Sequence, residues 1–394
     1  MEQISYDFTT FFDRRGQDAY SVDNVKGVME GYDIIPMWVA DMSFPAAPPV
    51  IKAIQSRLDM PHFGYFDPRD EWYDSIIRWH RSRNRVEYDR KSICYIHSVL
   101  GGMVTCYEAF TLPGDPVLTH SPRYTGYSTI EGCGRRAVYT DLKRDENGVW
   151  RMDFDDIESK LRKQHIRIFA LCAAHNPSGR VWERQELEQL VDICRRCGTI
   201  IVSDEIWSDI TIGDNRHTPP LSIKGAEDIT VALYSTTKTF SLAGVKGAYA
   251  VIPDPDLRSR FVSKANSTML NQMSIFSMYA IIGAYSPEGG EWLDQLLKVL
   301  TANIDMAYDR LTAHEGVTCM KTQGTYLLYP STAEWEKRSG TSHKELIRRG
   351  VERGVIWIDG DEYGTPGTIR INVAVPSHKL NEAMDRLDEF AFIG

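Results

Sequence analysis

Short apolar runs alternate with amphipathic stretches over the middle of the chain. Seven of these runs have the length and composition of buried strands, at residues 93–97, 116–119, 136–140, 167–172, 198–203, 229–234 and 247–252. Between several of them, apolar residues recur at helical spacing, at 99–110, 154–161 and 184–196. This alternation predicts an α/β fold in which helices flank a mostly parallel sheet.

The two ends of the chain follow other patterns. Residues 1–49 contain few periodic stretches, and the first helices are predicted from Pro48 to Leu58 and at 70–83. The later part predicts long helices at 256–266, 273–285 and 291–314, then short strands at 324–329, 354–357 and 368–373 with helices at 342–353 and 378–390. We therefore expect a large domain at 50–288 and a smaller one at 289–394, with the segment 1–49 contributing to the smaller domain.

Polar residues follow three of the predicted strands within four positions. Asn176 comes after the 167–172 run, Asp204 ends the 198–203 run and Lys238 follows the 229–234 run. The carboxyl ends of parallel strands meet at one edge of an open sheet, and ligands bind there. A lysine at this edge is a candidate for Schiff-base formation, although a loop lysine considered alone is more often an exposed surface residue.

Two further features of these strand ends indicate a charged ligand. An ionised carboxylate at the end of a buried strand is costly without a cation, so Asp204 needs a positive partner. The small-residue turn 98–102 leads from a strand into a helix, whose first amides point toward any anion in the crevice. The turn matches neither the dinucleotide-binding nor the P-loop pattern and is a weak signal by itself.

Composition narrows the classes of partner. The 54 acidic and 45 basic residues give a formal net charge of -9, which argues against a nucleic-acid or anionic-membrane partner. The longest apolar stretch, near 275–285, is too short to span a bilayer, and the N-terminus lacks the layout of a secretory signal, so we expect a cytoplasmic protein. We interpret the C-x-x-C of Cys194 and Cys197 as helix packing and predict no metal site.

Four motifs occur in the order and spacing of one large family. They are A-H-N-P-S-G-R at 174–180, S-D-E-I-W-S-D at 203–209, S-T-T-K-T-F-S-L-A-G at 235–244 and I-R-I-N-V at 369–373. With them, nearly the whole chain resembles fold-type I enzymes of the class I/II aminotransferase superfamily, which use pyridoxal 5′-phosphate (PLP). The resemblance implies an aspartate aminotransferase-like fold, with a large PLP-binding domain around a mostly parallel sheet and a smaller α+β domain.

The resemblance also implies roles for the strand-end residues. Lys238 would form a Schiff base with the cofactor aldehyde and act in catalysis with Asp204, which would pair with the ring nitrogen, and Tyr124, which would lie flat on the ring. Asn176 would donate to the ring oxygen O3′ and also contact the substrate.

The phosphate of the cofactor would have its own set of partners. Ser235 and Lys246 would bind it together with the amides near Val99 and Leu100. Trp207 would lie beside the ring, where relatives often carry His or Tyr. Three other positions differ from the family pattern: Ser43 stands in place of an acid, Ser98 in place of a glycine and Lys246 in place of an arginine. The lysine gives a point charge without the planar fork of arginine.

Within the superfamily, M-W-V-A-D-M-S-F-P at 37–45 and H-F-G-Y at 62–65 resemble the cystathionine β-lyase, or C-S lyase, branch. By that resemblance Arg370 would bind the substrate carboxylate bidentately and Val39 would contact the substrate. Tyr65 would reach the cofactor phosphate of the neighbouring subunit, which implies a homodimer with small amino-acid substrates.

The expected reaction is α,β-elimination from cystathionine or an S-substituted cysteine, giving pyruvate, ammonia and a thiol. The same groups would also serve an aminotransferase, and residue identities do not separate the two. A PLP-binding regulatory protein that acts through a protein partner is a more distant alternative. The S-x-x-K at 235–238 fits penicillin-binding serine acyltransferases, but the chain lacks their S-D-N and K-T-G motifs.

Overall fold

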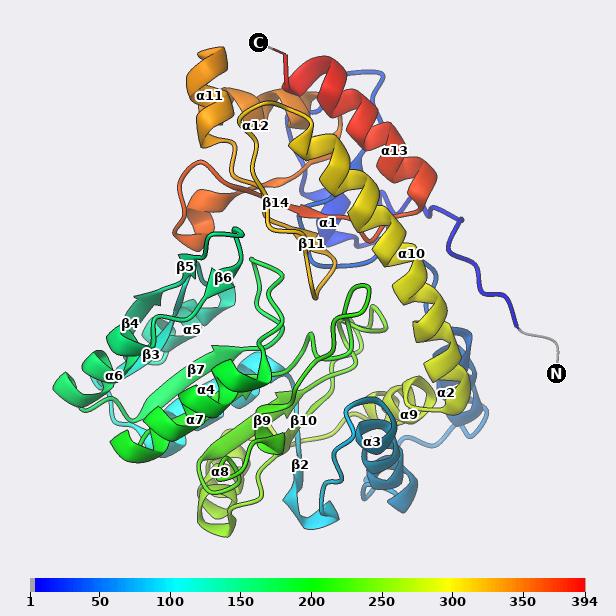
Figure 1. Cartoon of the computed structure of the whole chain (residues 1–394). Helices are drawn as coiled ribbons and strands as arrows, with labels where there is room; N and C mark the ends of the chain where they lie inside the picture. Colours follow the sequence, from blue (N-terminus) through cyan, green and yellow to red (C-terminus); the bar gives the residue numbers. More distant parts are fainter. Residues whose placement is uncertain (1–3, 394) are drawn as a thin grey trace.

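A seven-stranded sheet forms the centre of the larger part of the molecule (Figure 1). The computed structural model describes residues 4–393. In spatial order the strands are β2 (Ile93–Ile96), β10 (Ala248–Val251), β9 (Thr230–Tyr234), β8 (Ile200–Asp204), β7 (Ile168–Cys172), β3 (Pro116–Ser121) and β4 (Arg136–Asp141). All neighbours pair in parallel except β10, which is antiparallel to both β2 and β9. The carboxyl ends of six strands and the amino end of β10 therefore share one edge.

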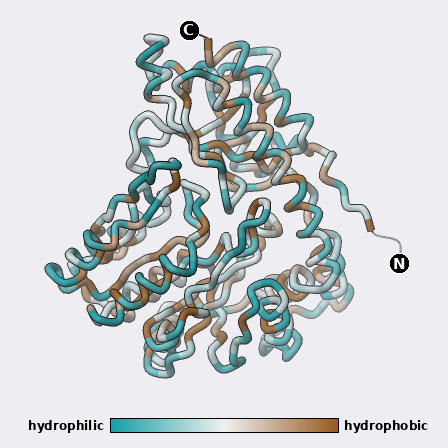
Figure 2. The backbone as a smooth tube through the Cα atoms, viewed as in Figure 1, coloured by the Kyte–Doolittle hydropathy of each residue, from teal (hydrophilic) through white to brown (hydrophobic). Residues whose placement is uncertain are grey.

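Alternating side chains of these strands form two buried layers. On one face, Val202, Val231 and Leu233 pack with α4 (Val99–Phe110) and α8 (Pro255–Thr268). On the other face, Phe169 and Ile201 pack with α6 (Phe154–Lys163) and α7 (Arg184–Cys197). The hydropathy-coloured tube shows this burial as brown strands inside largely teal outer helices (Figure 2). Covering both faces explains why these strands are continuous apolar runs.

Further helices complete the flanks of the sheet. They are α2 (Pro48–Leu58), α3 (Asp70–Arg83), α5 (Thr129–Gly132) and α9 (Ile275–Ala284), with 3-10 turns at Arg90–Ser92, Thr125–Ser128 and Pro220–Ser222. Tyr234 and Tyr249 extend from the β9 and β10 face into the same core as Trp72 and Trp79 of α3. This aromatic core continues into the second part of the molecule.

The second part is built on short strands. A three-stranded sheet has the order β11 (Leu327–Leu328), β14 (Ile369–Asn372) and β13 (Ile358–Asp359), and β1 (Ile35–Pro36) pairs in parallel with β12 (Val355–Ile356). The long helix α10 (Pro287–Thr312) connects the two parts (Figure 1). The surrounding elements are α1 (Tyr20–Asp23), α11 (Ala333–Ser339), the 3-10 turn Gly360–Tyr363, α12 (His343–Glu352), α13 (Ser377–Arg386) and a π-helix at Leu387–Ala391.

The boundaries differ from the sequence prediction where local capping decides them. Helix α10 begins at Pro287 rather than 291, because Ser286 accepts a hydrogen bond from the Gly289 amide at 3.0 Å and proline occupies the first turn. The predicted strand 324–329 is reduced to two paired residues. A hairpin of β5 (Lys143–Arg144) and β6 (Trp150–Arg151) was not predicted, since two-residue strands are too short to show a period.

Candidate active site

A cavity of about 210 Å³ lies at the carboxyl edge of the seven-stranded sheet. We call it the strand-end cavity. It brings together nine of the residues singled out from the sequence: Val99, Leu100, Tyr124, Asn176, Asp204, Trp207, Ser235, Lys238 and Lys246. Arg370, Val39 and Tyr65 are not among its lining residues and are described below.

Lys238 projects its amine toward the segment that precedes α2. Its Nζ donates a hydrogen bond to the Ala40 carbonyl at 2.6 Å and lies 5.8 Å from the centre of the Trp207 ring. Burial lowers the pKa of Lys238 to about 8, and Arg370 contributes in the same direction, while Asp41 opposes the shift. Roughly a tenth of the amine is therefore uncharged at pH 7, far more than for an ordinary lysine, and the uncharged form is the one that acts as a nucleophile or general base.

Asp204 is a buried carboxyl with no ion-pair partner among residues 4–393. Its Oδ1 accepts from the Ile206 amide at 3.1 Å, and its Oδ2 accepts from the Tyr127 hydroxyl at 3.4 Å. Burial raises the pKa of Asp204 to about 7. This is the state expected of a carboxyl placed for a cation, because a bound positive charge would restore the ionised form.

Arg370 lies next to Asn176 at the rim of the strand-end cavity. Its Nη1 donates to Asn176 Oδ1 at 3.2 Å and its Nη2 to the Trp38 carbonyl at 2.7 Å, while its buried Nε has no partner in the described chain. The side chain is only 4% exposed and lies 4.8 Å from the Tyr363 ring. A buried guanidinium without a carboxylate partner is a suitable site for a substrate carboxylate.

The segment that contains Val39 is held by side-chain hydrogen bonds from β14. Asn372 Nδ2 donates to the Val39 carbonyl at 2.7 Å and to the Asp41 carbonyl at 2.6 Å. Val39 itself is half-buried. The motifs at 37–45 and 369–373 therefore form one structural unit, and this unit brings the Ala40 carbonyl to Lys238.

Hydrogen-bond donors gather at the other end of the strand-end cavity. Ser98 caps α4 by accepting from the Gly101 amide at 3.1 Å, which leaves the Val99 and Leu100 amides at the start of the helix. Ser235 Oγ lies 2.7 Å from the Gly247 carbonyl. Gly247 has φ +99 and a side chain there would meet Ser277 at 2.9 Å, so only glycine fits beside Lys246. A helix N-terminus, a hydroxyl and an exposed ammonium together suit a phosphate.

Tyr65 is fully exposed on the loop that follows α2, away from the strand-end cavity of its own chain. Buried Arg57 holds this loop by donating to the Met60 carbonyl at 2.5 Å and to the His62 carbonyl. The Arg57 guanidinium also lies 5.1 Å from the Phe63 ring. The loop therefore has a defined shape, and it carries Tyr65 outward.

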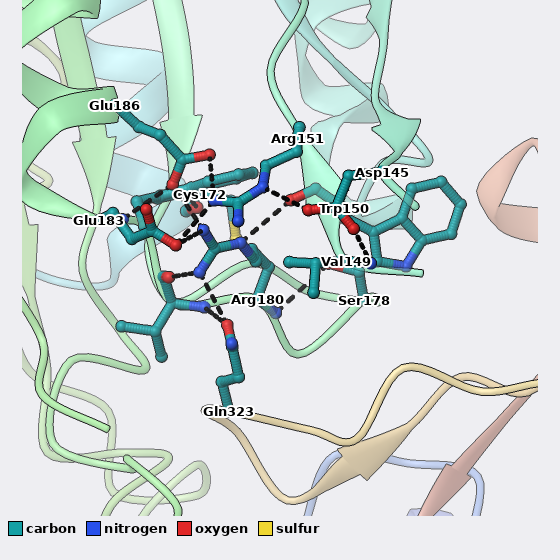
Figure 3. A network of polar contacts seen from close by, with 12 residues as sticks. Asp145, Val149, Trp150, Arg151, Cys172, Ser178, Arg180, Glu183, Glu186 and Gln323 are labelled. Carbon is teal, nitrogen blue, oxygen red and sulfur yellow. Dashed lines mark hydrogen bonds and ion pairs between the residues drawn. The ribbon is translucent and has the colours of Figure 1, made fainter. Parts of the chain in front are cut away.

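The loop that carries Asn176 is fixed by Arg180, which is 1% exposed (Figure 3). Its guanidinium donates to Glu186 at 2.6 Å, to Glu183 at 3.0 Å and to the Trp150 carbonyl at 3.0 Å. It also donates to Gln323 Oε1 at 2.8 Å, which connects the loop to the second part of the molecule. Arg180 therefore positions the strand-end residue without lining the cavity.

Replacing Arg180 by methionine is expected to destabilise the protein strongly. The substitution leaves Glu186 with Arg151, at 3.4 Å, as its only cation among the described residues, and it removes the donor to the Trp150 carbonyl. Breaking a buried ion pair on one side costs about 3 kcal/mol or more. Urea unfolding of the variant measures the change in the free energy of unfolding.

The matched control is Arg162→Met. Arg162 is 52% exposed and pairs with Glu158 at 2.7 Å on the helix surface. Surface pairs of this kind contribute about 1 kcal/mol or less. Equal losses in the two variants would contradict the structural role of Arg180.

Several lining residues were not predicted from the sequence. His97 and Thr237 line the strand-end cavity, and Tyr127 contacts Asp204. Thr237 stands inside a motif already identified, so its position next to Lys238 was an available signal. Tyr127 had no such signal, because its contact with Asp204 joins residues 77 positions apart in the chain.

The site has the groups that PLP needs, judged from the protein side chains alone. An amine with a lowered pKa, a buried carboxyl lacking a cation and a set of phosphate donors line one cavity. Across residues 4–393, no group of three or more His, Cys, Asp or Glu side chains is arranged to hold a metal ion. Within the same range, no helix has the length and hydrophobicity needed to cross a membrane.

Comparison with known proteins identifies relatives over almost the whole chain. The family described as aminotransferase class I and II matches residues 32–387. Cystathionine beta-lyase PatB of Bacillus subtilis is 32% identical over 95% of this chain and 97% of its own length. Protein MalY of Escherichia coli is 29% identical over 96% of this chain and 97% of its own.

Solved structures with the same fold include two PLP-bound proteins. A PLP-bound putative aminotransferase from Clostridium difficile has a TM-score of 0.91 at 31% identity, covering 99% of this chain and all of its own. A PLP-bound C-S lyase from Staphylococcus hominis has a TM-score of 0.90 at 25% identity, covering 99% of each chain. The predicted fold class is therefore confirmed.

Proposed function

The chain belongs to the aminotransferase class I and II family, and from this premise we propose that it is a PLP-dependent C-S β-lyase. Its substrates would be cystathionine or S-substituted cysteines, cleaved by α,β-elimination to pyruvate, ammonia and a thiol. The observation that carries the proposal is the likeness to a relative named cystathionine beta-lyase over 95% of this chain. The residues that line the strand-end cavity, with Arg370 beside Asn176, support the proposal.

The cofactor would occupy the strand-end cavity. PLP, when bound, provides an aldehyde that forms a Schiff base with an amine and a protonated ring that accepts the electron pair left at Cα. The residues that would hold it are Lys238 at the aldehyde, Asp204 at the ring nitrogen, Asn176 at O3′, Tyr124 and Trp207 around the ring, and Ser235, Lys246 and the amides of Val99 and Leu100 at the phosphate.

Individual side chains of this chain would then have separate roles in the elimination. Arg370 binds the α-carboxylate of the substrate, and its hydrogen bond to Asn176 aligns that carboxylate with the cavity. The Lys238 amine removes the Cα proton, and the Cβ–S bond breaks with both electrons leaving on sulfur. The thiolate takes up a proton, and water then releases ammonia and pyruvate.

The pH dependence of cofactor attachment tests the state of Lys238. Because burial lowers the pKa of Lys238 to about 8, the uncharged amine increases about tenfold per pH unit below that value and levels off above it. The rate at which the apoenzyme binds PLP covalently should follow this curve when recorded by visible absorbance. A rate that still climbs toward pH 10.5, the ordinary value for lysine, would contradict the assignment.

The homodimer expected from the sequence is part of this proposal. Ile51, Leu58, Met60, Phe63 and Tyr65 are all exposed on α2 and the loop after it. Ala243 lines both the strand-end cavity and an apolar groove of about 640 Å³, so the two adjoin. We infer that the loop of a second copy enters this groove and brings its Tyr65 to the cofactor phosphate.

Subunit mixing tests the shared site. A hybrid dimer of Tyr65→Ala and Lys238→Ala chains would contain one site with an intact lysine and an intact tyrosine from the opposite chain. The activity of the refolded mixture should exceed the sum of the two parent variants. Activities that simply add would show that Tyr65 acts within its own chain or not at all.

Transamination is the second candidate, because one solved relative at 31% identity is described as a putative aminotransferase. Incubation of the purified holoenzyme with cystathionine separates the two reactions by assays of pyruvate and free thiol. A parallel incubation with an amino acid and a 2-oxo acid tests for a new amino acid. Efficient transamination without pyruvate release would replace the lyase proposal. The cytoplasmic location stays a prediction.

A further inference from the structure

A second cavity, of about 500 Å³, is lined by four arginines. Arg83 and Arg85 come from the end of α3, Arg184 from the first residue of α7 and Arg216 from the loop after β8. We call it the arginine cavity, and it shares no lining residue with the strand-end cavity. We propose that the arginine cavity binds a small oxyanion, carried as a phosphate ester or a dicarboxylate.

Three of the four guanidinium groups are available to a ligand. Arg85 and Arg216 make no carboxylate contact within residues 4–393, and Arg216 donates only to the Asn215 carbonyl at 3.2 Å. Arg184 has a Glu188 contact of 3.8 Å, which is too long for a hydrogen bond. Arg83 is engaged, because it donates to Asp294 at 2.5 Å and to the Gly290 carbonyl at 2.7 Å.

The acids at the arginine cavity are already committed. Asp209 is half-buried and accepts hydrogen bonds from Trp79 at 2.9 Å and Thr239 at 3.3 Å. Asp294 is the partner of Arg83. The remaining charge that faces the cavity is positive, in a chain whose formal net charge is -9. Such a local reversal of sign favours anions over other small molecules.

His217 also lines the arginine cavity and connects its wall to the segment after β8. Its side chain is 4% exposed, with Nε2 donating to the fully buried Glu205 at 2.5 Å. No hydrogen bond of its Nδ1 is found in the described part of the chain.

Hydroxyl groups complete the polar wall. Ser208, Thr211, Thr218 and Ser222 also line the arginine cavity. Guanidinium groups with hydroxyls around a concave site are the usual partners of phosphate and carboxylate oxygens. The cavity adjoins the segment that follows Asp204, because Ser208 and Asp209 line it. The inference stands independently of the reaction proposed above.

Calorimetric titration of the PLP-loaded enzyme tests the proposal, because bound cofactor blocks the phosphate donors of the strand-end cavity. Inorganic phosphate and succinate are the two probes, and their relative affinities distinguish a phosphate-ester site from a dicarboxylate site. We expect saturable binding of at least one probe to each chain. Binding should weaken roughly tenfold or more in the Arg85→Gln/Arg216→Gln variant, since two charge-assisted contacts are lost.

The control variant, Arg78→Gln/Arg338→Gln, removes two exposed arginines that do not line the arginine cavity. It changes the net charge by the same amount, so it should bind the probes as the unmodified enzyme does. Equal weakening in both variants would show a general charge effect and overturn the proposal. The absence of saturable binding of either probe to the unmodified enzyme would also overturn it.

Discussion

The Lys238→Ala variant is expected to lose turnover by about a thousandfold or more, because the substitution removes the amine that moves the Cα proton. The visible absorbance of covalently attached PLP should disappear at the same time. Lys238 is the lysine whose amine contacts the Ala40 carbonyl inside the strand-end cavity, with a pKa of about 8. Steady-state release of pyruvate from cystathionine and the spectrum of the purified variant measure the two effects.

Lys246→Ala is the matched control for this result. Lys246 lines the same strand-end cavity but is assigned to the cofactor phosphate. Its loss should weaken cofactor binding while the covalent absorbance remains at saturating PLP. If the Lys238 variant keeps the absorbance and the Lys246 variant loses it, the two assignments are reversed.

Asp204→Asn should produce the second large effect. The amide keeps the shape of the side chain but removes the negative charge that would hold a protonated ring nitrogen. We expect turnover to fall on the order of a hundredfold or more, since electrostatic stabilisation in a buried site is lost. Affinity for PLP should fall roughly tenfold, in line with the loss of one charge-assisted hydrogen bond. Turnover at saturating PLP and equilibrium titration of the apoenzyme separate the two quantities.

Asp209→Asn serves as the comparison for Asp204. Asp209 is a half-buried carboxyl of the same segment, but it contacts Trp79 and Thr239 and does not line the strand-end cavity. Its substitution should change PLP affinity far less than Asp204→Asn does. A larger loss of affinity at Asp209 would show that the ring nitrogen is bound elsewhere.

Much of the fold could be predicted because the central strands are buried on both faces. Burial makes strands such as 230–234 and 200–204 largely apolar runs, and polar residues gather at their carboxyl ends. Two of those polar residues, Asp204 and Lys238, meet at one cavity because parallel strands end at the same edge. The roles given to them remain predictions for the experiments above.

The rest depended on contacts between distant segments. The pairing of His217 with Glu205 and the hydrogen bond from Tyr127 to Asp204 have no local pattern. The hairpin 143–151 is formed by two-residue strands around a turn in which Asp145 accepts from the Asn147 and Val149 amides. Its Asn147-Gly148 pair is a local signal of a hairpin turn, which the periodicity of apolar residues does not show.

Strand β10, the one antiparallel strand of the central sheet, also limits where the chain length can change among homologues. Because β10 runs against β9, the connection from 235 to 247 leaves and re-enters the sheet at the same edge and carries Lys238 and Lys246 together. A one-residue insertion there would displace both ammonium groups at once, whereas lengthening the exposed turn at 213–214 would move neither. We expect homologues to vary in length at the latter position and to keep the former connection constant.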